Sequence, residues 1–433
     1  MEPTITAKGS GYLIEWASKD VLARVRYPSV SGPGIKAECA VTHQGFPIHR
    51  SFLTLTSPSG MRDYERRLEQ RRPAADYQVD WSQVVEDLAG ITVDAIRAQL
   101  PERVLGEVTS DGTFTYRVDN VLIERANNVL YAEGGTGKSY WALFLATIIS
   151  EGYVDTDHRL VVEPGNVLYC DYETSDQAIS ERVRKLHNGL GINRPSKIIY
   201  QPMSIPFVQD LDRIMDVIDR RSINVLMIDS MGLAAGKIED SDQVQSFFRS
   251  LAYLNERFSL TTLVITHTNR QGTLFGSAYI QASARSLWEA KRTSGSIAEG
   301  SMDFSLFHRK ANDVAIQPAQ AWSVAFDAES VRYKRIDVYE TEAAGELSYA
   351  KLVERILHAD GPQDREYLDA KIAGLKLGDA DEKAIAKVRG NVATAITRHR
   401  TAGKLEERED GMLVWVKSAQ AQEDEEGEGE WSI

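Results

Sequence analysis

One stretch limits what this chain can fold into more than any other: AEGGTGKS, residues 132–139. It lies directly after an apolar run, NNVLY, and just before another, WALFLATIIS. Glycines let successive backbone N–H groups point at phosphate oxygens, and a helix that begins there adds the positive end of its dipole. The spacing therefore predicts a strand, a phosphate-binding loop and a helix. A chance glycine-rich turn is the alternative, and the flanking apolar runs disfavour it.

The residue types in this loop predict an ATP site. Lys138 would supply charge to the β- and γ-phosphates, and Ser139 would supply a Mg²⁺ ligand. The residues expected to contact ATP are Glu133, Gly134, Gly135, Thr136, Gly137, Lys138, Ser139 and Tyr140. ATP and Mg²⁺ are therefore the expected ligands.

Residues 101–340 alternate apolar runs with segments long enough for helices. The runs are NVLYAE, GNVLYCDYE, INVLMIDS, TTLVITHT and MDFSLFHRK. They are nearly continuous and rich in Val, Ile and Leu, as are strands of a parallel sheet that is buried on both faces. The pattern predicts an α/β core with a mostly parallel sheet flanked by helices.

Smaller units are expected on both sides of this core. Residues 1–100 begin with strand-like runs and continue with charged helical segments, which predicts a small strand-rich α+β accessory domain. Residues 345–418 predict three helices and then two strands around an Asp-Gly turn, an arrangement that resembles a winged helix binding DNA or protein. Residues 419–433 form an acidic tail that is expected to be disordered.

Composition excludes several classes of protein. The only cysteines are Cys39 and Cys170, which suits a reducing cytoplasm and argues against a disulfide or zinc framework. No apolar run is long enough to span a bilayer, so no membrane partner is expected. The net charge of −13 argues against a uniformly basic nucleic-acid binder, but residues 423–430 hold six acids and no base. The net charge therefore does not exclude local basic faces elsewhere in the chain.

Polar residues at other strand ends match what ATP hydrolysis needs. Asp229 ends one apolar run and is expected to hold the Mg²⁺ shell together with Ser139. Asp171 and Glu173 lie two residues apart and would face the same side of a regular strand; Glu173 is the better candidate for orienting the attacking water. His267 would lie beside the γ-phosphate and report its presence. The alternatives are a turn residue for Asp229, a helix cap for Glu173 and a structural role for His267.

Charge that develops on the transferred phosphate needs a cation. Candidates at element ends are Arg285, Arg292, Arg309 and Lys310. A P-loop enzyme without a suitable cation of its own often receives an arginine from a neighbouring subunit. Each candidate could equally form a surface ion pair.

Nucleic-acid contacts are expected from two places. The loops 232–241 and 270–277 contain glycines, and Lys237 and Arg270 in them could touch phosphates, unless the loops only connect elements. The segment 383–404 is basic and contains no acid. Its candidate residues are Lys383, Lys387, Arg389, Arg398, Arg400 and Lys404. Helical spacing does not place all of them on one face.

Taken in order, these motifs make residues 102–338 resemble the RecA-type ATPases, and among them the RepA-like and DnaB-like hexameric replicative helicases. The motifs are AEGGTGKS, GNVLYCDYET, VLMIDS, VITHTNR, GSAYIQASARSLW and HRKAND. The resemblance implies a RecA-like P-loop NTPase core, a hexameric ring with ATP between neighbours, and Glu173 as the catalytic glutamate. It implies Arg285 as the arginine finger on the plasmid-helicase pattern, or Arg309 and Lys310 on the DnaB pattern. The strand-rich N-terminal region departs from DnaB, and the winged helix is an addition to the small plasmid helicases.

The leading hypothesis is an ATP-dependent DNA helicase or translocase that acts as a ring on single-stranded DNA in replication. One alternative is an ATP-switched replication initiator or regulator that binds duplex DNA through the winged helix. Another is a recombination or repair ATPase. The expected setting is the cytoplasm of a prokaryote, in a phage or plasmid context, with further copies of the chain as partners. The acidic tail could bind a replication partner.

Overall fold

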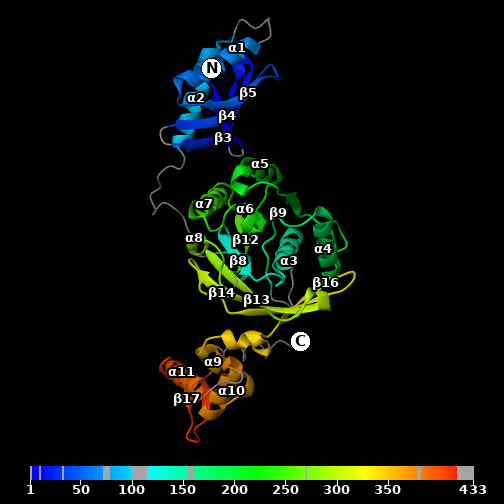
Figure 1. Ribbon diagram of the computed structural model, residues 1–433, viewed down its shortest axis with the longest axis vertical. Coiled ribbons are helices and arrows are strands. Elements are labelled where there is room, and N and C mark those ends of the chain that lie inside the picture. Colours follow the sequence, from blue (N-terminus) through cyan, green and yellow to red (C-terminus); the bar gives the residue numbers. More distant parts are fainter. Residues whose placement is uncertain are drawn as a thin grey trace, which may run out of the picture.

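The computed structural model describes residues 2–8, 11–31, 34–71, 79–98, 115–153, 160–269, 271–377 and 382–416. An N-terminal domain, a central domain and a C-terminal domain follow one another along the long axis (Figure 1). Arg270 and the acidic tail lie outside the described residues, so what is expected of them stays a prediction. Within the described residues, no helix is both long and apolar enough to cross a membrane.

The N-terminal domain is an antiparallel sheet backed by two helices. Its strands pair in chain order and are β1 (Thr4–Lys8), β2 (Gly11–Trp16), β3 (Val21–Ser31), β4 (Gly34–His43) and β5 (Phe46–Thr54). The helices are α1 (Pro58–Arg71) and α2 (Trp81–Arg97). Alternate residues of β4 are buried, which gives the sheet one inner face against the helices. The strand-rich N-terminal region is confirmed.

The central domain is built on a nine-stranded sheet in the order β10-β9-β11-β12-β8-β13-β14-β15-β16. The parallel strands are β8 (Asn127–Ala132), β9 (Val167–Asp171), β10 (Ile199–Pro202), β11 (Val225–Asp229), β12 (Thr261–His267) and β13 (Ser286–Ser296). The antiparallel strands are β14 (Ser301–Ala311), β15 (Gln320–Phe326) and β16 (Val331–Ile336). The short pair β6 (Tyr116–Val118) and β7 (Leu122–Ile123) precedes β8.

The mostly parallel α/β sheet is confirmed, but MDFSLFHRK is not a parallel strand. This run forms β14, which pairs antiparallel with β13 and β15. Only the turn over 297–300 separates β13 from β14, whereas a parallel neighbour needs a crossover of about a dozen residues or more. The run is apolar because most of its residues are buried on both faces.

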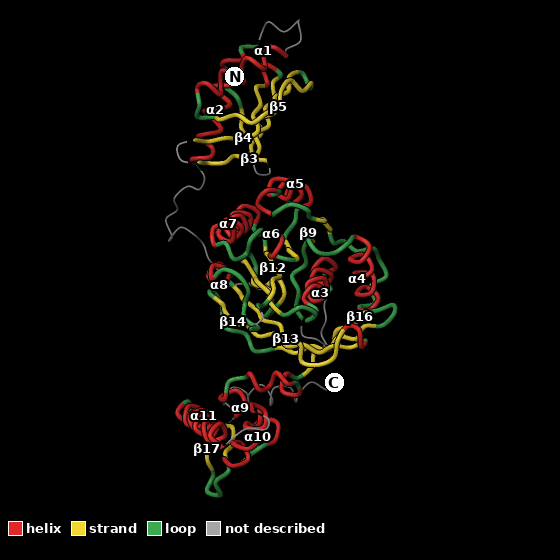
Figure 2. Tube along the Cα trace, viewed as in Figure 1, coloured by secondary structure: helices red, strands yellow, loops and turns green. Residues whose placement is uncertain are grey.

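Helices cover both faces of the parallel part of the sheet (Figure 2). One face packs against α3 (Lys138–Glu151) and α4 (Asp176–Gly189). The other face packs against α5 (Leu211–Arg221), α6 (Met231–Ala234), α7 (Ser241–Phe258) and α8 (Ala278–Ser283).

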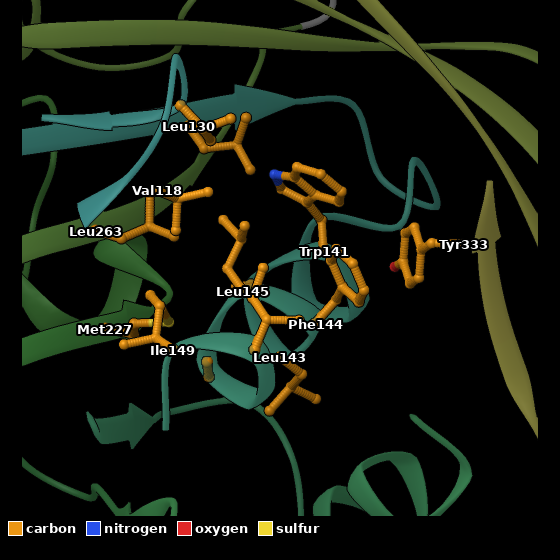
Figure 3. Close-up of a cluster of buried hydrophobic side chains, with 14 of the residues drawn as sticks. Val118, Leu130, Trp141, Leu143, Phe144, Leu145, Ile149, Met227, Leu263 and Tyr333 are labelled. Carbon is orange, nitrogen blue, oxygen red and sulfur yellow. The ribbon is translucent and has the colours of Figure 1, made fainter. Parts of the chain in front are cut away.

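Helix α3 is buried almost all round because the sheet curls about it. Its inner side lies on the parallel strands, while Trp141 and Phe144 face the antiparallel strands (Figure 3). Phe144 stacks on Tyr333 with ring centroids 4.3 Å apart, and Trp141 lies 5.0 Å from Trp322. This aromatic packing holds rigid the helix whose N-terminus ends the glycine-rich loop.

The C-terminal domain has the element order of a winged helix. It contains α9 (Tyr349–Asp360), α10 (Arg365–Leu377), α11 (Glu382–Thr401) and the hairpin β17 (Leu405–Glu407) and β18 (Leu413–Trp415). Gln363, between α9 and α10, forms an antiparallel bridge with Leu413 and so adds a third extended segment to the hairpin. Leu352, Leu368 and Val392 meet in its core.

Candidate active site

Four of the predicted catalytic residues, Lys138, Glu173, Asp229 and His267, meet at one edge of the central sheet. The predicted cations Arg285, Arg309 and Lys310 lie instead near the amino-terminal end of β13. The parallel strands β8, β9, β11 and β12 all end there, and polar groups follow each of them. The glycine-rich loop follows β8, Asp229 ends β11 and His267 ends β12. Open α/β sheets bind ligands at the carboxyl ends of their strands. With Glu173, which follows β9, the sheet therefore brings together four groups that lie far apart in the sequence.

Glycine is required within the phosphate-binding loop. Gly135 and Gly137 have φ angles of +74° and +84°, in the left-handed region that side chains disfavour. A Cβ at Gly137 would also lie 2.5 Å from the Met302 methyl carbon. Gly137 is the N-cap of α3, so the loop leads straight into the positive end of the helix.

Lys138 lies inside this loop. Its ammonium donates to the carbonyl oxygens of Ala132 and Glu133 at 2.9 and 2.7 Å. Burial lowers the pKa of Lys138 to about 8, against the opposing effect of Asp229 and Glu173. The ammonium is thus held against the first residues of the loop, the place expected of a lysine that binds phosphate.

Asp229 and Ser139 form the oxygen pair predicted for Mg²⁺. Asp229 is 2% exposed and accepts a hydrogen bond of 2.8 Å from the Tyr169 hydroxyl. Burial raises the pKa of Asp229, while hydrogen bonds from Ser139 and Tyr169 oppose the shift. A carboxylate touching a hydroxyl at a helix N-terminus fits a hard cation that prefers oxygen. Within the described part of the chain, no cluster of three or more His, Cys, Asp or Glu offers a rival metal site.

Glu173 is held by two partners at the neighbouring strand end. The Ser230 hydroxyl donates to its Oε1, and His267 Nε2 lies 3.6 Å from the same oxygen. Hydrogen bonding from His267, followed by that from Ser230, lowers the pKa of Glu173 to about 2, although burial opposes the change. The carboxylate is therefore ionised near neutral pH and accepts hydrogen bonds.

Ser230 was not selected from the sequence, and Asp171 caps the turn that follows β9. Strand β9 ends at Asp171, so the same-side arrangement of a regular strand is not formed. Asp171 accepts from the backbone N–H groups of Glu173 and Thr174 at 2.9 and 3.1 Å. It thereby stabilises the turn that carries Glu173. The available signal for Ser230 was its place directly after Asp229 in VLMIDS.

The loops predicted to contact nucleic acid pack against each other. The Ser277 amide donates to the Ile238 carbonyl at 2.8 Å, and the hydroxyls of Ser241 and Ser277 lie 3.1 Å apart. Part of the first loop is helical, since α6 spans 231–234. Lys237 is exposed on this paired surface. The second loop follows β12, which carries His267, and the first loop follows β11, which carries Asp229.

The predicted trans-acting cations differ in what they contact. Arg285 is 53% exposed, with its Nε 3.6 Å from Asp313. Lys310 donates to the carbonyls of Gln281, Ala282 and Ala284, at the C-terminal end of α8. Arg309 is bound to two carboxylates of its own chain. Arg309 and Lys310 would have to leave these partners to act on a neighbour, whereas Arg285 is presented at the surface.

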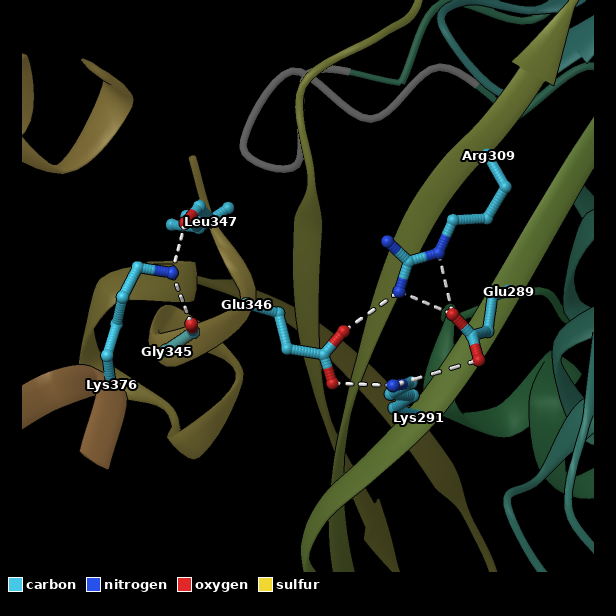
Figure 4. Close-up of polar contacts among 7 residues, drawn as sticks. All are labelled: Glu289, Lys291, Arg309, Gly345, Glu346, Leu347 and Lys376. Atoms are coloured by element: carbon cyan, nitrogen blue, oxygen red, sulfur yellow. Dashed lines mark hydrogen bonds and ion pairs between the residues drawn. The ribbon is translucent and has the colours of Figure 1, made fainter. Parts of the chain in front are cut away.

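Arg309 belongs to an ion-pair network that connects the central sheet to the C-terminal domain (Figure 4). Glu289 and Lys291 on β13 and Arg309 on β14 all contact one another or Glu346. Glu346 ends the short helix Glu342–Glu346 that leads into α9. Lys376 of α10 donates to the carbonyls on either side of Glu346, each at 2.8 Å.

The basic residues of α11 divide between two faces. Lys383, Lys387 and Arg398 share the exposed side opposite the buried residues Val388 and Val392. Of the remaining candidates, Arg389, Arg400 and Lys404 are also exposed, and Arg400 is paired with Glu407. The exposed hairpin residues are mostly acidic, namely Glu406, Glu407, Arg408, Glu409 and Asp410. The helix is therefore the cationic part of this domain.

Together, the sheet order, the glycine-rich loop and the acids at the strand ends define a P-loop NTPase with a RecA-like α/β core. Residues 108–273 match the protein family described as AAA domain. A KaiC-like protein from the hyperthermophilic archaeon Pyrococcus horikoshii OT3 has a similar structure, at 14% sequence identity and a TM-score of 0.38. That match covers 51% of this chain and 99% of the archaeal one. A comparison with curated proteins found no match.

Proposed function

We propose that the protein is an ATP-hydrolysing motor that translocates on single-stranded DNA and separates duplex DNA during replication. One observation supports hydrolysis above all others: Lys138, the Ser139–Asp229 pair and the Glu173–His267 pair meet at one sheet edge. Phosphate binding alone would need only the loop. Asp229 and Glu173, which are fixed at the adjacent strand ends, add the carboxylates that position the metal and the water.

In the proposed reaction, a water oxygen attacks the γ-phosphorus of ATP. The bond to the β,γ-bridging oxygen breaks, and ADP leaves with its electron pair. Glu173 orients the water by accepting a hydrogen bond; with a pKa of about 2 it is too weak a base to hold the proton, which passes to the phosphate. Lys138 offsets charge on the phosphates, and Ser139 and Asp229 would hold Mg²⁺, which supplies further positive charge.

The route from ATP to DNA in this proposal passes through His267. This residue contacts Glu173, and its carbonyl accepts from the Phe275 amide at 3.1 Å. A change at Glu173 would therefore reach the paired loops, where Lys237 is exposed. Further copies of the chain, arranged as a ring, would place these loops around a strand and Arg285 near a neighbour's ATP.

The cationic face of α11 favours a second candidate, an ATP-switched regulator that binds duplex DNA. Lys383, Lys387 and Arg398 could neutralise phosphates, and the network at Glu346 joins their domain to β13. Here the C-terminal domain would bind DNA and hydrolysis would reset the switch.

Steady-state ATP hydrolysis, with and without single-stranded DNA, tests the choice. The motor requires Mg²⁺-dependent turnover that single strands raise several-fold, and Lys138→Ala abolishes it. A matched lysine variant away from the site, Lys351→Ala on α9, should behave as wild type. The regulator would be supported, and the motor rejected, if single-stranded DNA leaves turnover unchanged and the C-terminal domain binds duplex DNA tightly.

A further inference from the structure

A cavity lies beside the phosphate-binding loop, on the side of β13. Its volume is about 280 Å³, and it is lined by Glu133, Gly134 and Thr136 of the loop, by Gln271 and Gly272, and by Arg292. The Arg292 Nη1 atom lies 4.0 Å from where a Cβ on Gly135 would be. The guanidinium thus faces the phosphate loop of its own chain.

Arg292 differs from the other candidate cations in what surrounds it. Lys310 caps α8, Arg309 is bound by Glu289 and Glu346, and Arg285 lies beside Asp313. Within the part of the chain that the structure describes, no ion pair occupies Arg292. Glu289 and Lys291 also line the cavity, and the Glu289 carboxylate is paired with Lys291 and Arg309, which offset its charge.

The position of Arg292 is set by the sheet. It lies on β13, where its Cα is in register with Phe304 of β14, and both strands are anchored against the core by Trp288 and Phe304. Strand β13 also pairs with β8, the strand that leads into the loop. The pairing with β8 ends at Glu289, and the register with β14 shifts directly after Arg292, so the pairing with Phe304 places Arg292 at the point where β13 leaves the loop strand.

We propose that Arg292 is a catalytic residue that acts within its own subunit, by binding oxygens of the terminal phosphate of ATP. A guanidinium presents N–H donors in a planar fork that matches phosphate geometry and keeps its charge. It would stabilise the negative charge on these oxygens as water adds to phosphorus and ADP departs. This role rests on the proposed ATP hydrolysis. It is separate from a cation given by a neighbour, for which Arg285 remains available.

The test compares Arg292→Ala, Arg292→Lys and wild type in ATP turnover and in binding of a fluorescent ADP analogue. We expect Arg292→Ala to lower kcat by about 10²- to 10³-fold, since cations at the transferred phosphate act mainly in the transition state. ADP affinity should change by less than about tenfold. Arg292→Lys should recover part of kcat. If the alanine variant does not fold, Arg292→Gln keeps an unbranched polar side chain without the charge and carries the same expectation.

Mixing of variants distinguishes a cation of the same subunit from one given by a neighbour. Lys138→Ala cannot use its own loop but retains Arg292, whereas Arg292→Ala retains its loop. If Arg292 acts in its own subunit, an equimolar mixture is no more active per intact loop than Arg292→Ala alone. Recovery of turnover in the mixture, or wild-type kcat in Arg292→Ala, would overturn the proposal. An inactive wild-type protein would instead overturn the proposed ATPase.

Discussion

The sheet edge that carries the phosphate-binding loop and the cationic face of α11 differ in how their charged side chains are fixed. At the sheet edge the acids are fixed: Asp229 is 2% exposed and hydrogen-bonded, and Glu173 is held by Ser230 and His267. On α11, Lys383 and Lys387 project from an exposed helix face above an apolar core. Fixed, partly dehydrated groups suit chemistry on a bound substrate, while exposed cations suit attraction that salt weakens. Substitutions should therefore have different signatures in the two regions.

The largest effect is expected at the fixed edge. Glu173→Gln keeps the shape of the side chain but removes the charge that orients water, so kcat should fall by about 10³-fold or more while nucleotide binding persists. Turnover and binding of the fluorescent ADP analogue are the measurements. The exposed Glu181→Gln on α4 is the matched control and should leave kcat unchanged. Equal losses of binding and of turnover would show that Glu173 is structural.

The next effect concerns the backbone of the loop. Gly137→Ala combines a φ of +84° with a close approach to Met302, so we expect a loss of about 1–3 kcal/mol in the free energy of unfolding. Nucleotide binding should weaken as well. Chemical denaturation checks the first result and titration with the ADP analogue the second. Gly374→Ala in α10 meets no neighbouring atom and should be neutral or stabilising; an equal loss in both variants would remove the loop-specific explanation.

Substitutions on the exposed face of α11 should change how duplex affinity depends on salt concentration. If Lys387 contacts a phosphate, Lys387→Ala should weaken duplex binding and make the slope of log affinity against log salt shallower by about 0.9. Turnover without DNA should stay at the wild-type level, because the residue lies far from the sheet edge in sequence and in the fold. Fluorescence anisotropy at several salt concentrations measures the slope. An unchanged slope would assign this domain to protein binding.

The acids at the sheet edge also predict a response to pH. The pKa of Glu173 is depressed to about 2, below the value of about 4.3 for an unfolded glutamate. A carboxyl group whose pKa is lower in the folded state than in the unfolded state stabilises the fold at pH values above its unfolded pKa. This stabilisation is lost as the pH falls through its folded pKa. Glu173→Gln should therefore unfold with a weaker pH dependence between about 2 and 4.3, measured by acid titration of fluorescence. Identical titrations would mean that the contacts of Glu173 with His267 and Ser230 do not depress its pKa in solution.

How far the sequence predicts this site depends on the kind of contact. Asp229 and His267 end apolar runs, so strand periodicity alone places them at one edge. The turn after β9 could not be predicted, because it depends on Asp171 accepting two backbone amides. Tyr169 looks like an ordinary core residue of its strand, although its hydroxyl donates to Asp229. The sequence names Arg292 as a candidate cation, but its place beside the loop depends on how β13 pairs with β8.

The smallest expected effect lies between the two regions, at Glu346. Its carboxylate joins Lys291 and Arg309 to the segment that enters the C-terminal domain. Its side chain and that of Arg309 are each 34% exposed, so solvent screens the pairs, and Glu346→Gln should cost only about 1 kcal/mol or less. Thermal unfolding measures this loss, with Glu329→Gln as a control in which another exposed ion pair, to Arg184, is removed. If ATP alters the duplex affinity of the wild type and not that of Glu346→Gln, the network carries the nucleotide signal to α11; if both respond alike, the two regions act independently despite their connection.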